Sequence, residues 1–206
     1  TIVGGNDRES GPKVTKRYVK DLNEIPYPES FIVPGTEAVH DRIQLETFRG
    51  CTQGCRYCQA GMVYRPRRER KAAGLVNSAA VLYERMGCEE ISLLSLNAPD
   101  YSEMETLMDG LMEYTAQRKI SISLPSTRMD TFTGELGRKM RAVRGTGLTL
   151  APEAGTQRLR DVINKRITDE EIMRTIDYAV GSGWKKIKLY FMIGLPVPGR
   201  GRGEAE

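Results

Sequence analysis

The chain has 206 residues, of which 39% are hydrophobic, so it is long enough to bury one substantial core. Its formal net charge of +4 is mild and does not by itself indicate a nucleic-acid partner. No apolar run approaches membrane-spanning length and no secretory signal opens the sequence, so we expect no membrane partner and a cytoplasmic location.

The first forty residues differ from the rest in composition. Residues 1–40 are polar and rich in proline and glycine, which favours a linker or a surface-wrapping N-terminal extension. Residues 41–196 carry regular apolar patterns and form the expected core, whereas residues 197–206 carry none and are expected to be a disordered tail. Because the chain begins at Thr1 and its last pattern ends near Pro196, we expect a fragment of a longer protein.

Within the core, strand patterns alternate with helical stripes. Strands are predicted at 43–48, 90–95, 120–124, 147–150 and 186–193, and helices at 75–86, about 102–117, about 134–143 and 168–180. Capping boxes beginning at Ser102 and Thr168 mark the starts of two helices. Five strands alternating with helices indicate an α/β fold with a parallel sheet and right-handed crossovers. No Gly-x-Gly-x-x-Gly follows a strand, so a dinucleotide-binding sheet has no support.

Three cysteines lie within eight residues, directly after the first predicted strand. Cys51, Cys55 and Cys58 form a C-x3-C-x2-C motif, which lets one loop present three thiolates to three corners of an iron–sulfur cube. A structural zinc site normally needs four ligands, and His40 is a candidate for the fourth. Unligated thiols are the remaining alternative. Cys88, at the end of a predicted helix, is best explained as a small buried hydrophobe.

The motif, with Tyr57 just before the third cysteine, resembles that of the radical S-adenosylmethionine (SAM) superfamily. The similarity runs from about Tyr27 to Pro196. It points more narrowly to the group with a B12-binding-like domain before the radical domain, on the segments at 46–51, 61–66, 151–161 and 188–196. This resemblance implies a partial (β/α) barrel, open on one side and truncated after about its fifth strand.

The resemblance also implies the chemistry. A [4Fe–4S] cluster on Cys51, Cys55 and Cys58 would bind SAM at its open iron and cleave it reductively to a 5′-deoxyadenosyl radical. The implied partners are SAM, a reductant such as flavodoxin or ferredoxin, and a substrate that the sequence does not identify. Cobalamin would be bound by a domain outside this chain, and the fragment is expected to be inactive alone.

Several cofactor contacts are expected at the carboxyl ends of the strands, where such barrels place their chemistry. Tyr57 is expected beside adenine, although it could equally pack the loop onto the barrel. Ser95 occupies the place of the usual glycine-rich turn that receives the methionine amino group. Ser126 is a candidate for a ribose hydroxyl, and Arg128 for the SAM carboxylate unless it is a surface residue.

The later strands supply the remaining candidates. Glu153 matches the family's glutamate-then-small-residue turn, and its carboxylate is expected to accept ribose hydroxyls rather than form a salt bridge. Met192 and Ile193 are expected against adenine, with simple core packing as the alternative.

Two other functions remain open. A structural or electron-relay module would hold the cluster without cleaving SAM, and would not need polar residues at the strand ends. A tRNA-modifying radical enzyme is a weaker alternative. The basic run at 65–71, with five positive charges around Glu69, could contact an anionic substrate, a cofactor carboxylate or nucleic acid, although such runs are usually solvated loops.

Overall fold

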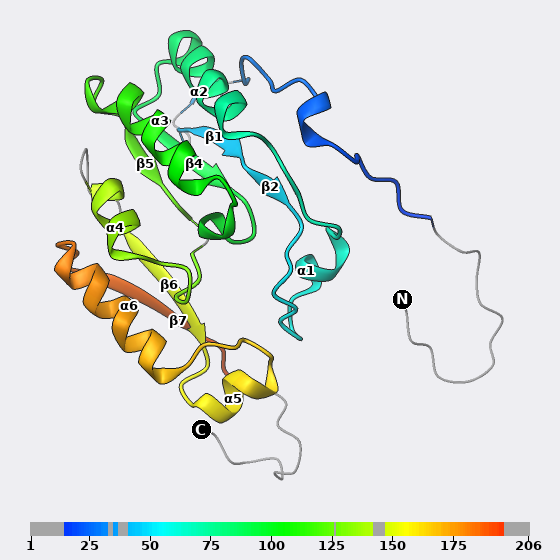
Figure 1. Ribbon diagram of the computed structural model, residues 1–206, viewed down its shortest axis with the longest axis vertical. Helices are drawn as coiled ribbons and strands as arrows, with labels where there is room; N and C mark the ends of the chain where they lie inside the picture. Colours follow the sequence, from blue (N-terminus) through cyan, green and yellow to red (C-terminus); the bar gives the residue numbers. More distant parts are fainter. Residues whose placement is uncertain (1–14, 33–34, 37–40, 126, 142–146, 196–206) are drawn as a thin grey trace.

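The computed structural model describes residues 15–32, 35–36, 41–125, 127–141 and 147–195 (Figure 1). The elements in chain order are η1 (Leu22–Glu24), β1 (Ile43–Glu46), β2 (Phe48–Arg49), α1 (Gln59–Val63), β3 (Arg68–Glu69), α2 (Ala72–Met86), β4 (Glu90–Leu94), η2 (Ala98–Asp100), α3 (Met104–Ala116), β5 (Ser121–Ser123), α4 (Gly134–Arg141), β6 (Leu148–Glu153), α5 (Gln157–Val162), α6 (Asp169–Gly181) and β7 (Ile187–Phe191). None of the helices in the described ranges combines the length and the apolar character needed to cross a bilayer.

The principal strands are parallel, as the alternating pattern predicts. One sheet has the order β1-β4-β5, and a second contains β6 and β7. The expected α/β fold with parallel strands is confirmed. The expected partial, open barrel is confirmed as well, because the described strands form no closed barrel. The prediction of one parallel sheet containing all five strands was wrong in one respect. Within the described residues no hydrogen bonds join β5 to β6, so the parallel strands form two sheets. A short antiparallel pair, β2 with β3, also follows β1 and precedes α2.

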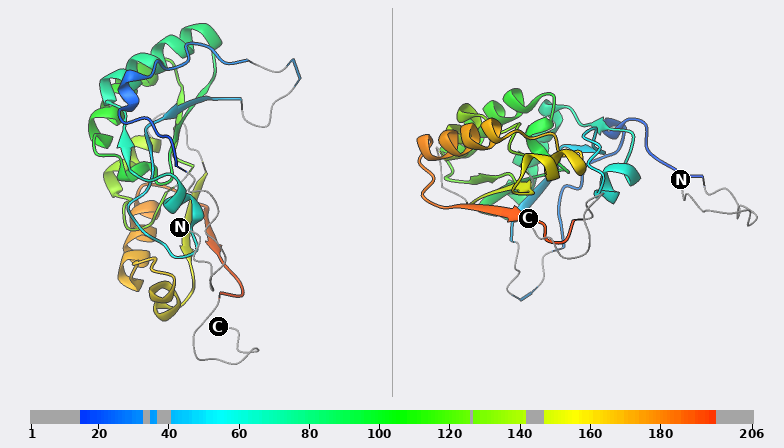
Figure 2. Two further views of the ribbon diagram at one scale, coloured as in Figure 1. Left: turned by 90° about the vertical axis from the view of Figure 1, so that its right-hand side faces the viewer. Right: turned by 90° about the horizontal axis from the view of Figure 1, so that it is seen from below.

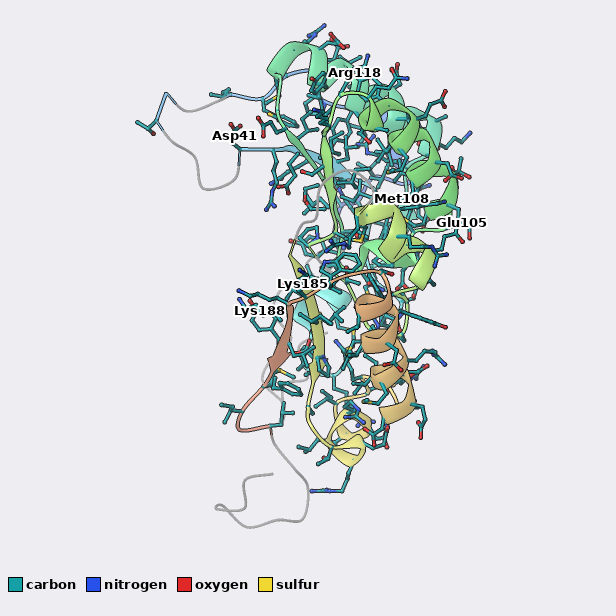
Figure 3. The ribbon with its side chains drawn as sticks, turned by 90° about the vertical axis from the view of Figure 1, so that its left-hand side faces the viewer. Asp41, Glu105, Met108, Arg118, Lys185 and Lys188 are labelled. Carbon is teal, nitrogen blue, oxygen red and sulfur yellow. The ribbon has the colours of Figure 1, made fainter. Side chains whose placement is uncertain are left out.

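The helices cover one face of the parallel strands. Figures 2 and 3 show α2, α3, α4 and α6 on one side, while Lys185 and Lys188, at the start of β7, lie on the other. On β1, Leu45 is fully buried in the core with Leu93 of β4, whereas the residue before it, Gln44, is exposed. Alternation of this kind places one set of side chains against the helices and leaves the other set on the inner face of the open barrel.

The helix boundaries test the capping signals. α2 ends at Met86 and is capped by Gly87, whose φ of 68° is the left-handed conformation that glycine adopts most readily. The capping box at Thr168 is confirmed, with both of its hydrogen bonds present at the start of α6. The capping box at Ser102 was wrong, because α3 begins at Met104 and the Ser102 hydroxyl instead donates to Glu69.

The described part of the N-terminal segment runs along the core. Leu22 is fully buried, and the Arg70 guanidinium donates to the carbonyls of Leu22 at 2.7 Å and Ile25 at 3.1 Å. The Tyr27 hydroxyl donates to the Gln44 carbonyl at 2.6 Å. These contacts attach residues 22–27 to the core, whereas the surface-wrapping extension and the domain boundaries at 40 and 196 stay predictions.

A second, smaller apolar cluster lies beneath the turn that follows β6, and a buried arginine organises that turn. The cluster contains Ala154, Leu159 and Ile163. The side chain of Arg160 has no exposed surface; it donates to the Ala154 carbonyl at 3.1 Å and the Ile167 carbonyl at 2.7 Å. It also forms an ion pair with Asp169. Buried carbonyls need such partners, so Arg160 fixes the chain between β6 and α6.

Replacing Arg160 with methionine should therefore destabilise the protein. Arg160→Met leaves several buried carbonyls without a donor, and we expect a loss of about 3 kcal/mol in the free energy of unfolding. The exposed Arg174→Met is the matched control, with an expected change of less than about 0.5 kcal/mol. Urea denaturation followed by circular dichroism measures both, and equal stabilities would show that Arg160 does not organise this turn.

Candidate active site

The cysteine loop connects β2 to α1 through two glycines in the left-handed conformation. Gly50 has a φ of 89° and Gly54 a φ of 72°. A Cβ at Gly50 would lie 2.8 Å from the carbonyl oxygens of Tyr64 and Pro66, so a side chain there would force this backbone apart. The start of the loop is therefore packed tightly against the chain that returns after α1.

The three cysteines of the motif are free thiols, and each sulfur accepts a hydrogen bond. The donors are the Gln53 N–H to Cys51 Sγ at 3.4 Å, the Gly61 N–H to Cys58 Sγ at 3.3 Å, and Arg128 Nη1 to Cys55 Sγ at 3.5 Å. Hydrogen bonds to sulfur are one means by which proteins tune iron–sulfur clusters. Three hydrogen-bonded sulfurs on one loop fit the donor set of a cubane cluster.

A site for a single metal ion requires a different arrangement of ligands from that of a cubane cluster. Among the described residues, no group of three or more His, Cys, Asp or Glu side chains is arranged to hold one metal ion. A cubane does not require that convergence, because each thiolate binds a different iron. His40, the fourth ligand of the zinc alternative, lies outside the described residues. The assignment of Cys51, Cys55 and Cys58 as cluster ligands stays a prediction.

Arg128 is not a surface residue. It is 7% exposed, and its guanidinium binds Asp130 in a bidentate pair at 2.8 and 3.0 Å while Nη2 also donates to the Lys165 carbonyl at 2.7 Å. Burial alone would lower the pKa of Arg128, but the hydrogen bond and charge of Asp130 raise it above its ordinary value. The structure thus places a permanent positive charge beside Cys55. The expected contact with the SAM carboxylate stays a prediction, and it would have to share a guanidinium that Asp130 already binds.

Glu153 ends β6 in a strained conformation. Its φ of 71° is uncommon for a residue with a side chain, and such strain is concentrated at functional sites. Its carboxylate accepts from the Tyr57 hydroxyl at 2.8 Å and from Lys165 Nζ at 3.1 Å, and Lys165 is 4% exposed. Burial, then the hydrogen bond from the hydroxyl to Glu153, raises the pKa of Tyr57, so the hydroxyl remains a donor. Glu153 therefore forms a salt bridge with Lys165 and also lies at the end of a strand, and its contact with ribose stays a prediction.

The turn between α5 and α6 anchors the cysteine loop. Asn164 Nδ2 donates to the Gly54 carbonyl at 2.8 Å, and the Arg56 N–H donates to the Ile163 carbonyl at 2.9 Å. Asn164 and Arg166 both have a φ of 56°. Neither this turn nor Lys165 was identified from the sequence. The signal available was Asn164, because asparagine adopts the left-handed conformation more readily than most residues.

The other predicted contacts are dispersed. Ser95 follows β4, and its hydroxyl is buried without a hydrogen-bond partner in the described structure. The Met192 N–H donates to the Glu153 carbonyl at 2.8 Å, whereas Ile193 is fully exposed, so core packing does not explain it. Ser126 lies outside the described residues. The structure therefore brings Tyr57, Arg128 and Glu153 together around Cys55 and Lys165, and leaves Ser95 apart.

Cys88 is separate from the motif. It precedes β4, whereas the cysteine loop follows the end of β1, so the two lie at opposite ends of parallel strands. It is buried, and burial followed by the nearby Asp41 raises the pKa of its thiol. A raised pKa and burial are typical of an unreactive structural cysteine.

Comparison with known sequences identifies the family. The sequence model of the Radical SAM superfamily matches residues 45–200, which is most of the chain. The uncharacterized protein MJ0966 of Methanocaldococcus jannaschii is 35% identical over 184 residues, covering 89% of this chain and 40% of that protein. The chain thus spans about two fifths of the length of this relative.

Comparison with solved structures agrees in fold. The methyltransferase TsrM of Kitasatospora setae, with cobalamin and a [4Fe–4S] cluster bound, matches with a TM-score of 0.59 and 13% identity over 72% of this chain and 30% of that one. TsrM with tryptophan and a SAM analogue matches with a TM-score of 0.57 and 13% identity over 73% of this chain and 30% of that one. At this identity the likeness concerns the fold alone. Together with the sequence match, it leads to one conclusion: the chain belongs to the radical SAM superfamily.

Proposed function

We propose that this chain is the core of a radical SAM enzyme, in which Cys51, Cys55 and Cys58 hold a [4Fe–4S] cluster. The family match over residues 45–200 carries the proposal, and three free, hydrogen-bonded thiols on one loop support it. When bound, the cluster supplies the electron that cleaves SAM to methionine and a 5′-deoxyadenosyl radical. The activity and substrate of the whole protein are part of the proposal, because the chain spans 40% of its relative.

The residues around Cys55 have distinct roles in this proposal. Arg128 places its positive charge against the Cys55 sulfur and stabilises added negative charge there. Glu153 offers a carboxylate at the end of β6, where two ribose hydroxyls can donate to it. Lys165 orients that carboxylate through its 3.1 Å ion pair. The Tyr57 ring, half exposed beside the same carboxylate, is available to pack against adenine.

The remaining partners follow the family. A cytoplasmic reductant such as flavodoxin or ferredoxin would supply the electron. Cobalamin, which the TsrM structure contains, would be bound by a domain outside this chain.

An electron-relay module without SAM cleavage is the second candidate. It is favoured by the contacts that already satisfy Glu153 and Arg128 within the protein, since these residues have structural roles without a cofactor. A tRNA-modifying enzyme gains less support. Arg67 and Arg70 of the basic run are engaged with the protein itself, through Glu69 and the carbonyls of the N-terminal segment.

Cysteine substitution tests the ligand assignment. Cys55→Ala should lose the cluster after anaerobic reconstitution, because the cluster needs all three of the cysteine sulfurs that this loop supplies. Cys88→Ala is the matched control and should keep it. Iron and sulfide analysis with visible absorbance measures both; a Cys55→Ala protein that retains full iron content would contradict the assignment.

Product formation tests the activity. The reconstituted full-length protein, reduced with dithionite in the presence of SAM, should form 5′-deoxyadenosine, detected by chromatography and mass spectrometry. Cys55→Ala should form none. A wild-type cluster that is reduced but gives no 5′-deoxyadenosine would leave the relay module as the better account.

Substitution of Glu153 tests ribose binding. Glu153→Ala should weaken SAM binding by about 1–3 kcal/mol, because it removes the acceptors of the ribose hydroxyls. Lys165→Met breaks the same ion pair but keeps the carboxylate, so its effect on SAM affinity should be smaller. Isothermal titration calorimetry measures both. If neither variant loses SAM affinity, Glu153 has only the salt-bridge role.

A further inference from the structure

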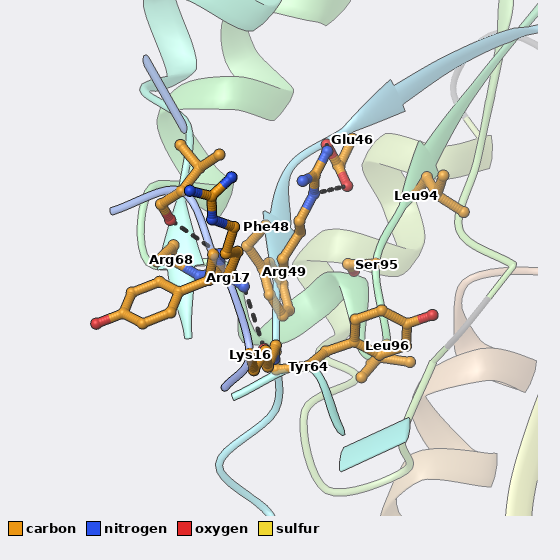
Figure 4. Close-up of a pocket in the computed structure, with 13 residues that line it drawn as sticks. Lys16, Arg17, Glu46, Phe48, Arg49, Tyr64, Arg68, Leu94, Ser95 and Leu96 are labelled. Carbon is orange, nitrogen blue, oxygen red and sulfur yellow. Dashed lines mark hydrogen bonds and ion pairs between the residues drawn. The ribbon is translucent and has the colours of Figure 1, made fainter. Parts of the chain in front are cut away.

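A pocket of about 560 Å³ lies beside the cysteine loop, and Glu153 is not among the residues that line it. Its walls are the N-terminal segment 16–19, the chain from the end of β1 to Gly50, and the residues that follow β4. Figure 4 shows Lys16, Arg17 and Arg68 along one wall and Leu94, Ser95 and Leu96 along the opposite wall. Its volume lies in the range of small-molecule binding pockets, and Gly50 connects it directly to Cys51.

The charges around this pocket do not cancel. Arg49 and Glu46 form a bidentate ion pair at 2.6 and 3.0 Å, which accounts for the one acidic side chain in the lining. Lys16 donates to the neutral Arg65 carbonyl at 2.9 Å, and Arg68 donates to the neutral Val19 carbonyl at 2.9 Å. These hydrogen bonds give the Lys16 and Arg68 side chains acceptors, but the acceptors carry no negative charge that would offset the two cations. Arg17 has no hydrogen-bond or ion-pair partner among the described residues, so the pocket keeps an excess of positive charge.

The rest of the lining is largely apolar, with one buried hydroxyl that has no hydrogen-bond partner within the described residues. Phe48, Leu94 and Leu96 contribute hydrophobic surface, and Leu94 and Leu96 are both exposed to the pocket side despite their size. The Ser95 hydroxyl is buried and has no partner within the described structure. A buried hydroxyl is normally hydrogen-bonded, so Ser95 offers a donor to a ligand group.

This pocket is not complementary to SAM. With its sulfonium and amino groups against one carboxylate, SAM carries a net positive charge, which the excess of Lys and Arg would repel. Tyr57, Arg128 and Glu153 are absent from the pocket lining, so the proposed nucleoside contacts lie elsewhere. Ser95, which the sequence made a candidate for the SAM amino group, does line the pocket and is assigned to the pocket instead. The two sites therefore differ in charge and share the cysteine loop as their boundary.

We propose that the pocket binds the substrate, and that this substrate is a small organic anion: an apolar or aromatic body bearing a carboxylate or a phosphate. Lys16, Arg17 and Arg68 attract the anionic group, Ser95 donates a hydrogen bond to the ligand, and the apolar wall holds the body. Binding of the anion rests on the pocket alone, whereas its role as substrate rests on the proposed radical SAM function.

A matched set of naphthalene probes tests the charge preference. The reconstituted protein is titrated with 1-naphthyl phosphate, 2-naphthoate and 1-naphthylmethylammonium, and binding is followed by ligand fluorescence. Both anions should bind about tenfold more tightly than the cation, and raising the salt from about 0.05 to about 0.5 M should weaken only the anions. The tighter of the two anions identifies the acidic group. Equal binding of anions and cation would overturn the proposal.

Two substitutions locate the binding. Arg17→Glu should weaken anion binding about tenfold, while Arg174→Glu, the same change of charge on α6 away from the pocket, should leave it unchanged. Ser95→Ala should weaken binding about threefold to tenfold without lowering the melting temperature, since the hydroxyl has no partner to lose. Equal effects of Arg17→Glu and Arg174→Glu would show that the anions bind elsewhere.

The outcomes separate the two proposals. If wild-type protein forms 5′-deoxyadenosine but shows no anion preference, the pocket assignment is wrong and the proposed function stands. If the anions bind as expected but no 5′-deoxyadenosine forms, the proposed function fails and the anion site remains without its role as a substrate site.

Discussion

The position of the cysteine loop depends on a junction with chain segments far away in sequence. Arg128 lies at its centre, with one amino group on the Cys55 sulfur and another on the Lys165 carbonyl. The Asn164 amide and the Arg56 backbone add hydrogen bonds across more than a hundred residues. These contacts hold the cysteine loop in one position against the helices and strands of the core, as a binding loop requires.

The same junction explains why the residues at the strand ends have two roles. Glu153 is held by Lys165 and Tyr57, and its backbone conformation is strained at the place where a nucleoside is proposed to bind. Strain of this kind persists only where surrounding contacts enforce it, and the fully buried Arg160 supplies such contacts one turn further on. Stability and the proposed cofactor binding thereby depend on the same segment between β6 and α6. The proposed anion-binding pocket beside the loop is built from other segments, so its ligand can be recognised independently.

The sequence predicted the elements whose signals are local. The five principal strands and the helices between them follow from apolar periodicity. As expected, Gly87 caps the end of α2 and Thr168 caps the start of α6. The cysteine spacing and the family resemblance led to the correct superfamily. Ser102 misled because Glu69, distant in sequence, competes for its hydroxyl. The basic run looked like a solvated loop, yet Arg70 is buried against the N-terminal segment. Lys165 and the pocket beside Gly50 depend on contacts between distant segments, which no local pattern records.

The central claim is that one iron of a three-cysteine cluster remains open and binds SAM directly. Electron–nuclear double resonance on the reduced, reconstituted protein, with SAM labelled at its amino nitrogen and carboxylate oxygens, tests this most directly. The account predicts hyperfine coupling from both labels to the cluster, and loss of that coupling when SAM is omitted. A reduced cluster that shows no coupling to either label, or a protein that binds only zinc, would contradict it.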